Sequence, residues 1–284
     1  MNLIDVSHWQ GSINWLAVKS DDIEGAIIKA GGSDDGFYTD SKFEDNYIGA
    51  KSVGLSVGAY YFVGPDCKST EDGIADAKRF IDILSGKQFD LPVYIDFECP
   101  DASNKKGNTD SVIGFCETME DAGYFVGVYA SDISGFQDRL ELERLTPYTL
   151  WVARYGSEPV NATNWDIWQY SSQGSVSGIN GNVDLNNCRR TDFINTIING
   201  GFNGYNETNN TETKSQTNTI EIGMPVTIRP GAIDLNTGYQ FADFVYETNY
   251  IVLEVQDRGV VFGTELGGTP TGVVSYNDIF YKEV

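Results

Sequence analysis

The stretch "LPVYIDFECP", residues 91–100, places two acids in an otherwise apolar run that ends at Pro100. Burying a carboxylate in such a run is costly unless something compensates for the lost hydration. In a strand, residues two apart face the same side, so Asp96 and Glu98 would share one face with Tyr94. Because the acids come last in the run, they would lie at the carboxyl end of the strand, where parallel barrels carry their active sites. The stretch therefore predicts a functional strand end.

Strand-like and helical segments alternate over the first two thirds of the chain. The strand-like runs are "LIDVS", "GAIIKAG", "VGAYYFV", "LPVYIDFE", "YFVGVYAS", "YTLWVARYG" and "WDIWQYS". Residues 69–86 have helical spacing, with Ser69 and Asp72 resembling a capping box and Gly86 as the stop, and residues 109–123 repeat the pattern. This alternation indicates βαβ units and a parallel sheet.

The last strands break this rhythm. Residues 157–164 alone separate the runs "YTLWVARYG" and "WDIWQYS", and a helical crossover needs about a dozen residues or more. We therefore expect loops between the closing strands and some antiparallel pairing. The predicted fold class is α/β, an irregular (β/α) barrel with about five βα units followed by helix-poor closing strands.

The composition changes at residue 200. Residues 200–219 are mostly Gly, Asn, Thr and Ser and predict a flexible linker. Residues 220–284 hold short strand-like runs, including a hairpin that turns at Asp257, Arg258 and Gly259. The expected organisation is a catalytic barrel over 1–199, a linker over 200–219 and a small all-β domain over 220–284.

Charge and residue counts exclude several classes of function. The 284 residues carry a formal net charge of −22, so nucleic acid is not an expected partner, and such a charge favours a soluble monomer. The single histidine, His8, rules out a histidine-rich zinc site and is expected to be a hydrogen-bonded structural residue. The four cysteines form no CxxC pair and are expected to be reduced thiols: Cys67, Cys99, Cys116 and Cys188.

Cofactors and membrane insertion are not expected either. The loop "GGSDDG", residues 31–36, lacks the spacing of an EF-hand and is interpreted as a solvated turn, so no metal or cofactor is predicted. The start "MNLIDVSHWQ" has no signal-peptide pattern, and no apolar run is long enough to cross a membrane. We expect synthesis in a cytoplasm.

Further acids occupy strand ends in the same manner. Asp5 closes the run "LIDVS", and Asp184 lies in "NVDLN" near the end of the barrel segment. Four strand-end acids on one cleft would suit glycoside hydrolysis, in which one carboxyl delivers a proton and another, ionised, stabilises or attacks the oxocarbenium ion. Neighbouring negative charges would hold the proton in place. The alternative is that such acids bind backbone amides or a metal.

Five segments together resemble glycoside hydrolase family 25, the Chalaropsis-type lysozymes common among phage endolysins. They are "DVSHWQG" (5–11), "GAYYF" (58–62), "YIDFE" (94–98), "LWVARYG" (150–156) and "WQYSSQGSVSGINGNVDLN" (168–186). The resemblance spans about residues 1–200. It implies a (β/α) barrel that cuts the β-1,4 bond between N-acetylmuramic acid and N-acetylglucosamine of bacterial peptidoglycan with retention.

The resemblance also implies roles for the acids. Glu98 corresponds to the general acid, and Asp96 to a partner that stabilises the cation or orients the substrate's acetamido group as an internal nucleophile. Asp5 and Asp184 correspond to supporting acids. Which group is the nucleophile stays open.

Other polar and aromatic residues at or near strand ends are candidate sugar ligands, with barrel packing as the alternative. Tyr60 matches the family's cleft tyrosine. The full set is Tyr60, Phe62, Tyr129, Trp151, Trp168 and Gln169.

The segment 220–284 resembles, more faintly, a bacterial Src-homology-3-like domain that binds the cell wall or a wall-associated polymer. The resulting expectation is an endolysin that reaches the wall with holin-type help and lyses the host. Two alternatives remain. Barrel chitinases carry D-x-D-x-E, but position 94 is Tyr here; a carbohydrate-binding protein on a decayed barrel would not need both Asp96 and Glu98.

Overall fold

The computed structural model describes residues 1–205, 222–228, 232, 234–237, 241–246, 248–256, 259–274 and 279–281. The chain divides into two compact units, Met1–Asn206 and Glu207–Val284.

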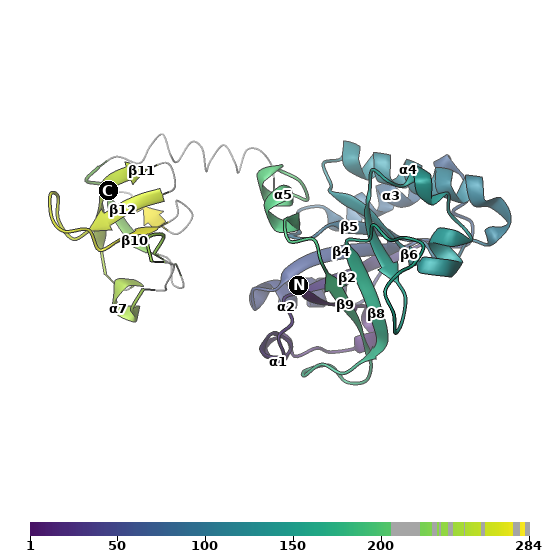
Figure 1. Cartoon of the computed structure of the whole chain (residues 1–284), viewed down its shortest axis with the longest axis horizontal. Helices are drawn as coiled ribbons and strands as arrows, with labels where there is room; N and C mark the ends of the chain where they lie inside the picture. Colours follow the sequence, from purple (N-terminus) through teal and green to yellow (C-terminus); the bar gives the residue numbers. More distant parts are fainter. Residues whose placement is uncertain are drawn as a thin grey trace. The chain divides into compact units, whose positions relative to one another are not determined.

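The first unit is built on a closed sheet of eight strands (Figure 1). They are β1 (Asn2–Val6), β2 (Gly25–Gly32), β4 (Ser56–Phe62), β5 (Val93–Asp96), β6 (Val126–Ser131), β7 (Thr149–Ala153), β8 (Ile167–Gly174) and β9 (Val183–Cys188). Neighbours from β1 through β8 pair in parallel, and β1 pairs with β2 to begin the ring. β9 closes it by pairing antiparallel with both β8 and β1. The predicted barrel with an antiparallel closing strand is confirmed.

In the first unit, four α-helices connect consecutive barrel strands from β1 to β6, and a fifth follows β9. They are α1 (Trp15–Ser20), α2 (Phe43–Ser52), α3 (Thr70–Leu84), α4 (Lys105–Asp121) and, after β9, α5 (Phe193–Asn199). Shorter elements are η1 (His8–Gln10), β3 (Tyr38–Thr39) at the edge of β2, η2 (Ala102–Asn104) and η4 (Leu142–Arg144). After β6 the chain forms a six-residue π-helix, η3 (Asp132–Gln137), instead of an α-helix. Four α-helical crossovers are therefore present rather than about five, and Gly135 lowers the α-helix propensity of this segment.

Local signals set the limits of α3 as expected. The Ser69 hydroxyl accepts from the Asp72 amide (3.3 Å) and donates to the Asp72 carboxylate (2.7 Å), and Gly86 has φ +76° just beyond the helix. α3 lies beside α4 (Figure 1). Gly73 makes this possible, because a Cβ there would collide with the Ser111 carbonyl of α4.

The side chains of each barrel strand alternate between two environments. Outward residues such as Ile95 and Val128 pack in the core shared with the helices. Inward residues include Tyr94, Tyr129 and Trp151, whose rings contact one another at centroid distances of 5.3 Å (Tyr94–Trp151) and 4.4 Å (Tyr129–Trp151). This aromatic layer fills the barrel and forms a floor beneath the polar residues at the carboxyl ends of the strands.

The barrel unit extends beyond the boundary expected at residue 199. Phe202 packs edge-on against Phe125 (5.8 Å between centroids), Asn203 is fully buried, and the Tyr205 hydroxyl donates to Asp90 (2.6 Å). Residues 200–205 thus belong to the barrel rather than to a linker, because their polar groups pair with barrel backbone and side chains. Residues 206–219 of the expected linker lie outside the described residues.

The second unit contains a five-stranded antiparallel sheet in the order β13-β12-β11-β10-β14. Its elements are β10 (Pro225–Ile228), α7 (Asp243–Tyr246), β11 (Tyr250–Gln256), β12 (Gly259–Gly263), β13 (Gly272–Val274) and β14 (Ile279–Tyr281). β11 and β12 form the expected antiparallel pair, although Asp257 and Arg258 of the predicted turn lie outside the described residues. The short α7 was not expected. In neither unit do the described residues include a helix that could span a membrane.

Candidate active site

Four acids at strand ends line one cavity of about 330 Å³. Asp96 is the last residue of β5, and Glu98 follows it at the cavity mouth. Asp5 on β1 and Asp184 on β9 are direct register partners in the antiparallel pair. The fold therefore brings together all four acids that the sequence singled out.

Asp5 lies at the bottom of this acidic group. Its carboxylate accepts from the Gln169 amide (3.0 Å) and the Asn186 amide (2.8 Å), both of which are buried. Burial, reinforced by the neighbouring charge of Asp184, raises the pKa of Asp5 to about 8, although the two hydrogen bonds oppose the rise. Burial also raises the pKa of Asp184. Two carboxyls this close cannot both ionise easily, so the pair retains a proton at neutral pH.

Asp96 and Glu98 form a second coupled pair. Burial raises the pKa of Asp96 well above its usual range, and the charge of Glu98 adds to the rise. Desolvation also raises the pKa of Glu98, while its interaction with Asp96 lowers it. The proton is therefore a property of the pair rather than of either residue in the unliganded cavity. A raised carboxyl pKa is what a proton donor at neutral pH requires.

Among the described residues that line this cavity, Lys29 is the one cation. It lies on β2, is buried, and holds its ammonium 4.4 Å from the centre of the Phe62 ring. Its charge lowers the pKa values of both Asp96 and Glu98 and so limits their protonation. Lys29 was not expected at the site, although a lysine inside the apolar run "GAIIKAG" is a visible signal.

Five of the six candidate sugar ligands line the cavity: Tyr60, Phe62, Tyr129, Trp151 and Gln169. Tyr129 and Trp151 are nearly fully buried. The Tyr129 hydroxyl donates to the Gln169 side chain (2.9 Å), and the Trp151 indole donates to the Asn186 side chain (2.7 Å). These two side chains form the floor.

Trp168 is not part of the cavity. It precedes the inward-facing Gln169 on β8 and therefore faces outward, where its ring packs against Trp165 (6.0 Å) and Tyr170 (5.7 Å). Its indole donates to the Arg154 carbonyl (2.7 Å). Adjacent strand residues cannot both point into the barrel, so the expectation for Trp168 is corrected to a packing role.

Several residues that line the cavity were not expected from the sequence: Ser7, Trp9, Lys29, Asp34 and Tyr155. Most lie in loops after the strands. Tyr155, for example, donates to Gln169 (3.3 Å) from a loop whose position depends on the buried Asp132. The Asp132 carboxylate accepts from the amides of Val160, Asn161 and Ala162 (3.0 Å each) and from the Arg154 guanidinium (2.7 Å).

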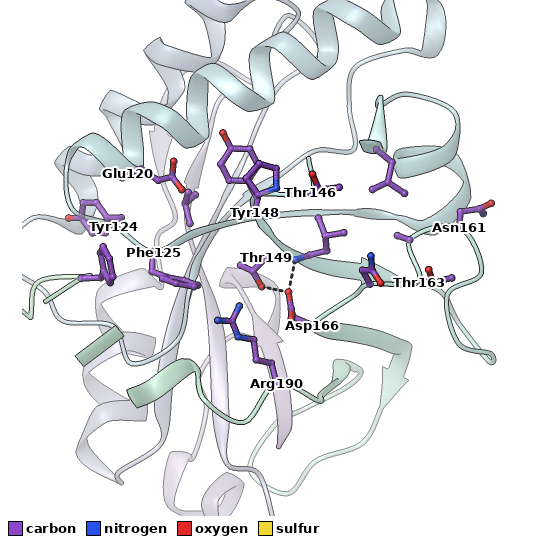
Figure 2. A pocket seen from close by; sticks show the side chains of 17 residues that line it. Glu120, Tyr124, Phe125, Thr146, Tyr148, Thr149, Asn161, Thr163, Asp166 and Arg190 are labelled. Atoms are coloured by element: carbon purple, nitrogen blue, oxygen red, sulfur yellow. Dashed lines mark hydrogen bonds between the residues drawn. The ribbon is translucent and has the colours of Figure 1, made fainter. Parts of the chain in front are cut away.

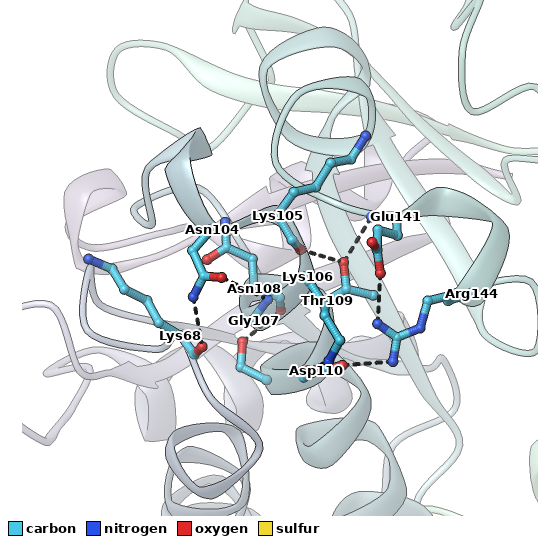
Figure 3. A network of polar contacts seen from close by, with 11 residues as sticks. Lys68, Asn104, Lys105, Lys106, Gly107, Asn108, Thr109, Asp110, Glu141 and Arg144 are labelled. Atoms are coloured by element: carbon cyan, nitrogen blue, oxygen red, sulfur yellow. Dashed lines mark hydrogen bonds and ion pairs between the residues drawn. The ribbon is translucent and has the colours of Figure 1, made fainter.

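The segment that follows Glu98 is fixed by a polar network at the start of α4 (Figure 3). The Asn104 side chain accepts from the Gly107 amide (3.2 Å) and donates to the Lys68 carbonyl (3.4 Å). The Thr109 hydroxyl donates to the Lys105 carbonyl and accepts from the Glu141 amide, both at 2.8 Å. These contacts tie the start of α4 to the loops before α3 and after β6.

A larger cavity, of about 470 Å³, lies at the other end of the barrel (Figure 2). Its lining includes the first residues of β6 and β7, Val126 and Thr149, and therefore the amino ends of the strands. Its Asp166 carboxylate accepts from the Thr149 hydroxyl (2.7 Å) and the Leu150 amide (3.1 Å), so it joins two strands. The cavity with the four acids is the better candidate for chemistry. No cluster of His, Cys, Asp and Glu among the described residues has an arrangement that would hold a metal ion.

Comparison with known protein families agrees with this geometry. The model for "Glycosyl hydrolases family 25" matches residues 4–179, a stretch that includes Asp5, Asp96 and Glu98. The chain belongs to glycosyl hydrolase family 25. The match ends before Asp184, whose place beside Asp5 follows from the pairing of β9 with β1.

The chain is similar to several relatives and solved structures. An "Autolytic lysozyme" of Clostridium acetobutylicum is 32% identical over 202 residues, which make up 71% of this chain. The chain spans 58% of the length of that relative. The structure of the CTP1L endolysin has a TM-score of 0.60 at 25% identity and covers 69% of this chain and 68% of its own. The autolysin LytC of Streptococcus pneumoniae, solved with a synthetic peptidoglycan ligand, has a TM-score of 0.58 at 26% identity, covering 65% of this chain and 46% of its own.

The buried acids of a family 25 barrel should cost stability at neutral pH. Burial raises the pKa of Asp5 from its ordinary value of 3.8 to about 8, so the folded state binds more protons than the unfolded state between these values, and the free energy of unfolding falls as pH rises through this window. We expect Asp5→Asn to raise the melting temperature at pH 7.5 by about 2–4 °C and to have little effect at pH 4. Asparagine can still accept from Gln169 and donate toward Asp184. Thermal unfolding at the two pH values checks this, and a lower melting temperature at pH 7.5 would contradict it.

Proposed function

We propose that this protein is an N-acetylmuramidase. It would hydrolyse the β-1,4 bond between N-acetylmuramic acid and N-acetylglucosamine in bacterial peptidoglycan, with retention. The observation that carries the proposal is the convergence of Asp5, Asp96, Glu98 and Asp184 on one cavity in a family 25 barrel. A lysozyme and an endolysin among its similar proteins support the same chemistry.

The proposed mechanism divides the work between the two coupled carboxyls at the end of β5. Glu98, at the cavity mouth, gives its proton to the glycosidic oxygen as the bond to the anomeric carbon breaks. Asp96, deeper in the cavity, stabilises the positive charge that develops on the sugar or orients the 2-acetamido oxygen for attack on that carbon. Water then attacks the anomeric carbon and returns a proton to Glu98, which acts as base in this second step.

The remaining acids and Lys29 would set the electrostatics of the cavity. The Asp5–Asp184 pair retains negative charge near the sugar, which favours a cationic transition state. Lys29 keeps the acidic group from becoming fully protonated, since its charge opposes the rise of the Asp96 and Glu98 pKa values.

Identification of the new reducing ends tests the proposed bond specificity. Purified peptidoglycan is digested, the ends are reduced with borohydride, and the fragments are analysed by mass spectrometry. A muramidase yields reduced N-acetylmuramic acid at the new ends. Reduced N-acetylglucosamine would show that the other glycosidic bond is cut, and binding without new reducing ends would favour the non-catalytic alternative.

We further propose that the second unit is a Src-homology-3-like domain that binds the wall or a wall-associated polymer, and that the protein acts as an endolysin released to the wall with holin-type help. A five-stranded antiparallel sheet supports this reading. Tethering a catalytic unit to its polymeric substrate raises the local concentration without changing the chemistry.

Removing the second unit should therefore separate two activities. We expect residues 1–206 to cleave soluble glycan oligomers at the rate of the full chain and to lyse intact cells about tenfold more slowly or worse. Rates of both proteins on both substrates provide the measurement. Equal losses on oligomers and cells would show that the second unit belongs to the catalytic machinery, and an unchanged rate on cells would show that it does not bind the wall.

A further inference from the structure

Trp9 presents a large apolar ring to solvent at the rim of the acidic cavity. Its side chain lines the cavity together with Asp5 and Glu98, yet the residue is 80% exposed. Its indole contacts the His8 ring at a centroid distance of 4.6 Å. Three other tryptophans, Trp15, Trp151 and Trp165, are buried. One exposed apolar side chain needs no explanation by itself. Trp9, however, borders the acidic cavity on a turn that hydrogen bonds hold in place.

The turn that carries Trp9 is held by several hydrogen bonds. The Ser7 hydroxyl accepts from the Trp9 amide (3.2 Å), and the Ser7 amide donates to the Gln10 side chain (2.8 Å). The buried Asp40 carboxylate accepts from both the His8 amide (3.2 Å) and the His8 ring (2.7 Å). Ser7 and Asp40 are both buried, and Asp40 also accepts from the Lys42 amide (2.9 Å), which anchors it outside the turn. The single histidine of the chain thus helps to fix an exposed indole, which lowers the entropy cost of binding to it.

The position of Trp9 differs from that of the proposed acid. Trp9 follows β1, whereas Glu98 follows β5, and β2 and β4 lie between these strands in the sheet. A second exposed ring, Tyr155 (57% exposed), follows β7 on another part of the rim. Trp9 and Glu98 therefore border the cavity from different strand ends, so a sugar that lay on Trp9 would be a different unit of the glycan from the sugar at Glu98.

We propose that Trp9 forms a separate glycan subsite, in which its indole stacks on the apolar face of a pyranose ring one or more units away from the scissile bond. Ligand sites that take apolar surfaces are lined by aromatic rings, and a tryptophan supplies a large contact area at low conformational cost. Trp9 is thus a specificity residue for chain length rather than a catalytic residue. This inference rests on the proposed function, since it takes the ligand to be a glycan chain.

Fluorescence offers a direct test of binding. In a Glu98→Gln background, which binds the chain without cutting it, long glycan oligomers should shift the indole emission to shorter wavelength as Trp9 leaves water. Trp9→Phe in the same background should lose most of the shift and retain affinity within about threefold, because a ring remains. Trp9→Ala should weaken binding about tenfold. An undiminished emission shift in the Trp9→Phe protein would overturn the proposal.

Kinetics on oligomers of increasing length provide the second test. Trp9→Ala should lower kcat/KM about tenfold on long oligomers and leave kcat/KM on the shortest cleaved oligomer unchanged. Trp9→Phe should retain most of the wild-type kcat/KM on long oligomers. Leu16→Ala, on α1 and 73% exposed outside the cavity, is the control and should be neutral. If the wild-type protein cuts no glycan, the proposed function fails and this inference fails with it. If the wild type cuts glycan and Trp9→Ala matches Leu16→Ala at every length, only the subsite is wrong.

Discussion

Replacing Glu98 with glutamine is expected to abolish cleavage of peptidoglycan while leaving the barrel folded. Glutamine keeps the size of the side chain but cannot give a proton to the leaving oxygen, and general acid catalysis contributes about 10²–10⁴-fold to a rate. Glu98 is exposed at the cavity mouth and lies outside β5, so the substitution removes little packing. Release of reducing ends gives the rate, and thermal unfolding of the same sample checks the fold.

The matched comparison is Asp96→Asn, which removes the other carboxyl of the pair. Both variants should be slow on peptidoglycan, but they should differ on an aryl glycoside whose phenolate leaves without protonation. The Glu98→Gln protein should regain much of its rate on such a substrate, whereas Asp96→Asn should not, because the charge on the sugar would still lack its partner. Near-normal turnover of peptidoglycan by folded Glu98→Gln would remove the proposed general acid.

The strand-end acids could be recognised in the sequence because strand periodicity is strict. Asp96 and Glu98 fall two apart at the end of an apolar run, and the structure brings both to the cavity that also holds Asp5 and Asp184. The same periodicity argues against Trp168 as a sugar ligand. Trp168 is adjacent to Gln169 on β8, and only one of the two side chains can point into the barrel. The face of the strand on which a residue lies therefore predicts its place in the cavity better than its distance from the strand end does.

Loop residues of the cavity could not be predicted by periodicity. Tyr155 donates to Gln169 from a loop that the Asp132 carboxylate holds through backbone amides roughly thirty positions later, at Asn161 and Ala162. Such contacts depend on the three-dimensional course of two loops, which no local pattern encodes. Trp9 lies in the family-like segment "DVSHWQG", residues 5–11, yet the sequence does not show its exposure or the hydrogen bonds that hold its turn.

Composition was a poor guide to the end of the barrel for a physical reason. The segment after residue 199 is polar and glycine-rich, which is typical of a linker. Buried backbone groups, however, need polar partners rather than apolar ones. Asn203 supplies them: its side chain donates to the Leu91 carbonyl (2.9 Å) and accepts from the Phe125 amide (2.7 Å), and its carbonyl accepts from the Phe89 amide (3.1 Å). A polar residue can therefore be fully buried and still belong to the fold.

The second large effect expected is that a protein ending at residue 199 is far less stable than one ending at residue 206. Truncation removes the Asn203 partners of four backbone groups of the barrel, the Leu91 and Gly123 carbonyls and the Phe89 and Phe125 amides, and each lost hydrogen bond costs about 0.5–1.5 kcal/mol. The total, at least about 2 kcal/mol, is a large share of the roughly 5–15 kcal/mol that stabilises a domain. Loss of the Tyr205–Asp90 hydrogen bond adds to it. Urea unfolding of the two proteins gives the difference in free energy of unfolding.

Point variants of the 1–206 protein assign this loss to Asn203. Its φ of +54° lies in the left-handed region, which glycine adopts freely and alanine does not. Asn203→Gly should therefore show the loss of the side-chain hydrogen bonds alone, and Asn203→Ala should be less stable still, by about 1 kcal/mol. Asn180→Ala, at an exposed position, is the control and should be neutral within about 0.5 kcal/mol. Equal stability of the 1–199 and 1–206 proteins would mean that residues 200–205 rest on the barrel without supporting it, and the boundary expected from composition would then be the thermodynamic one.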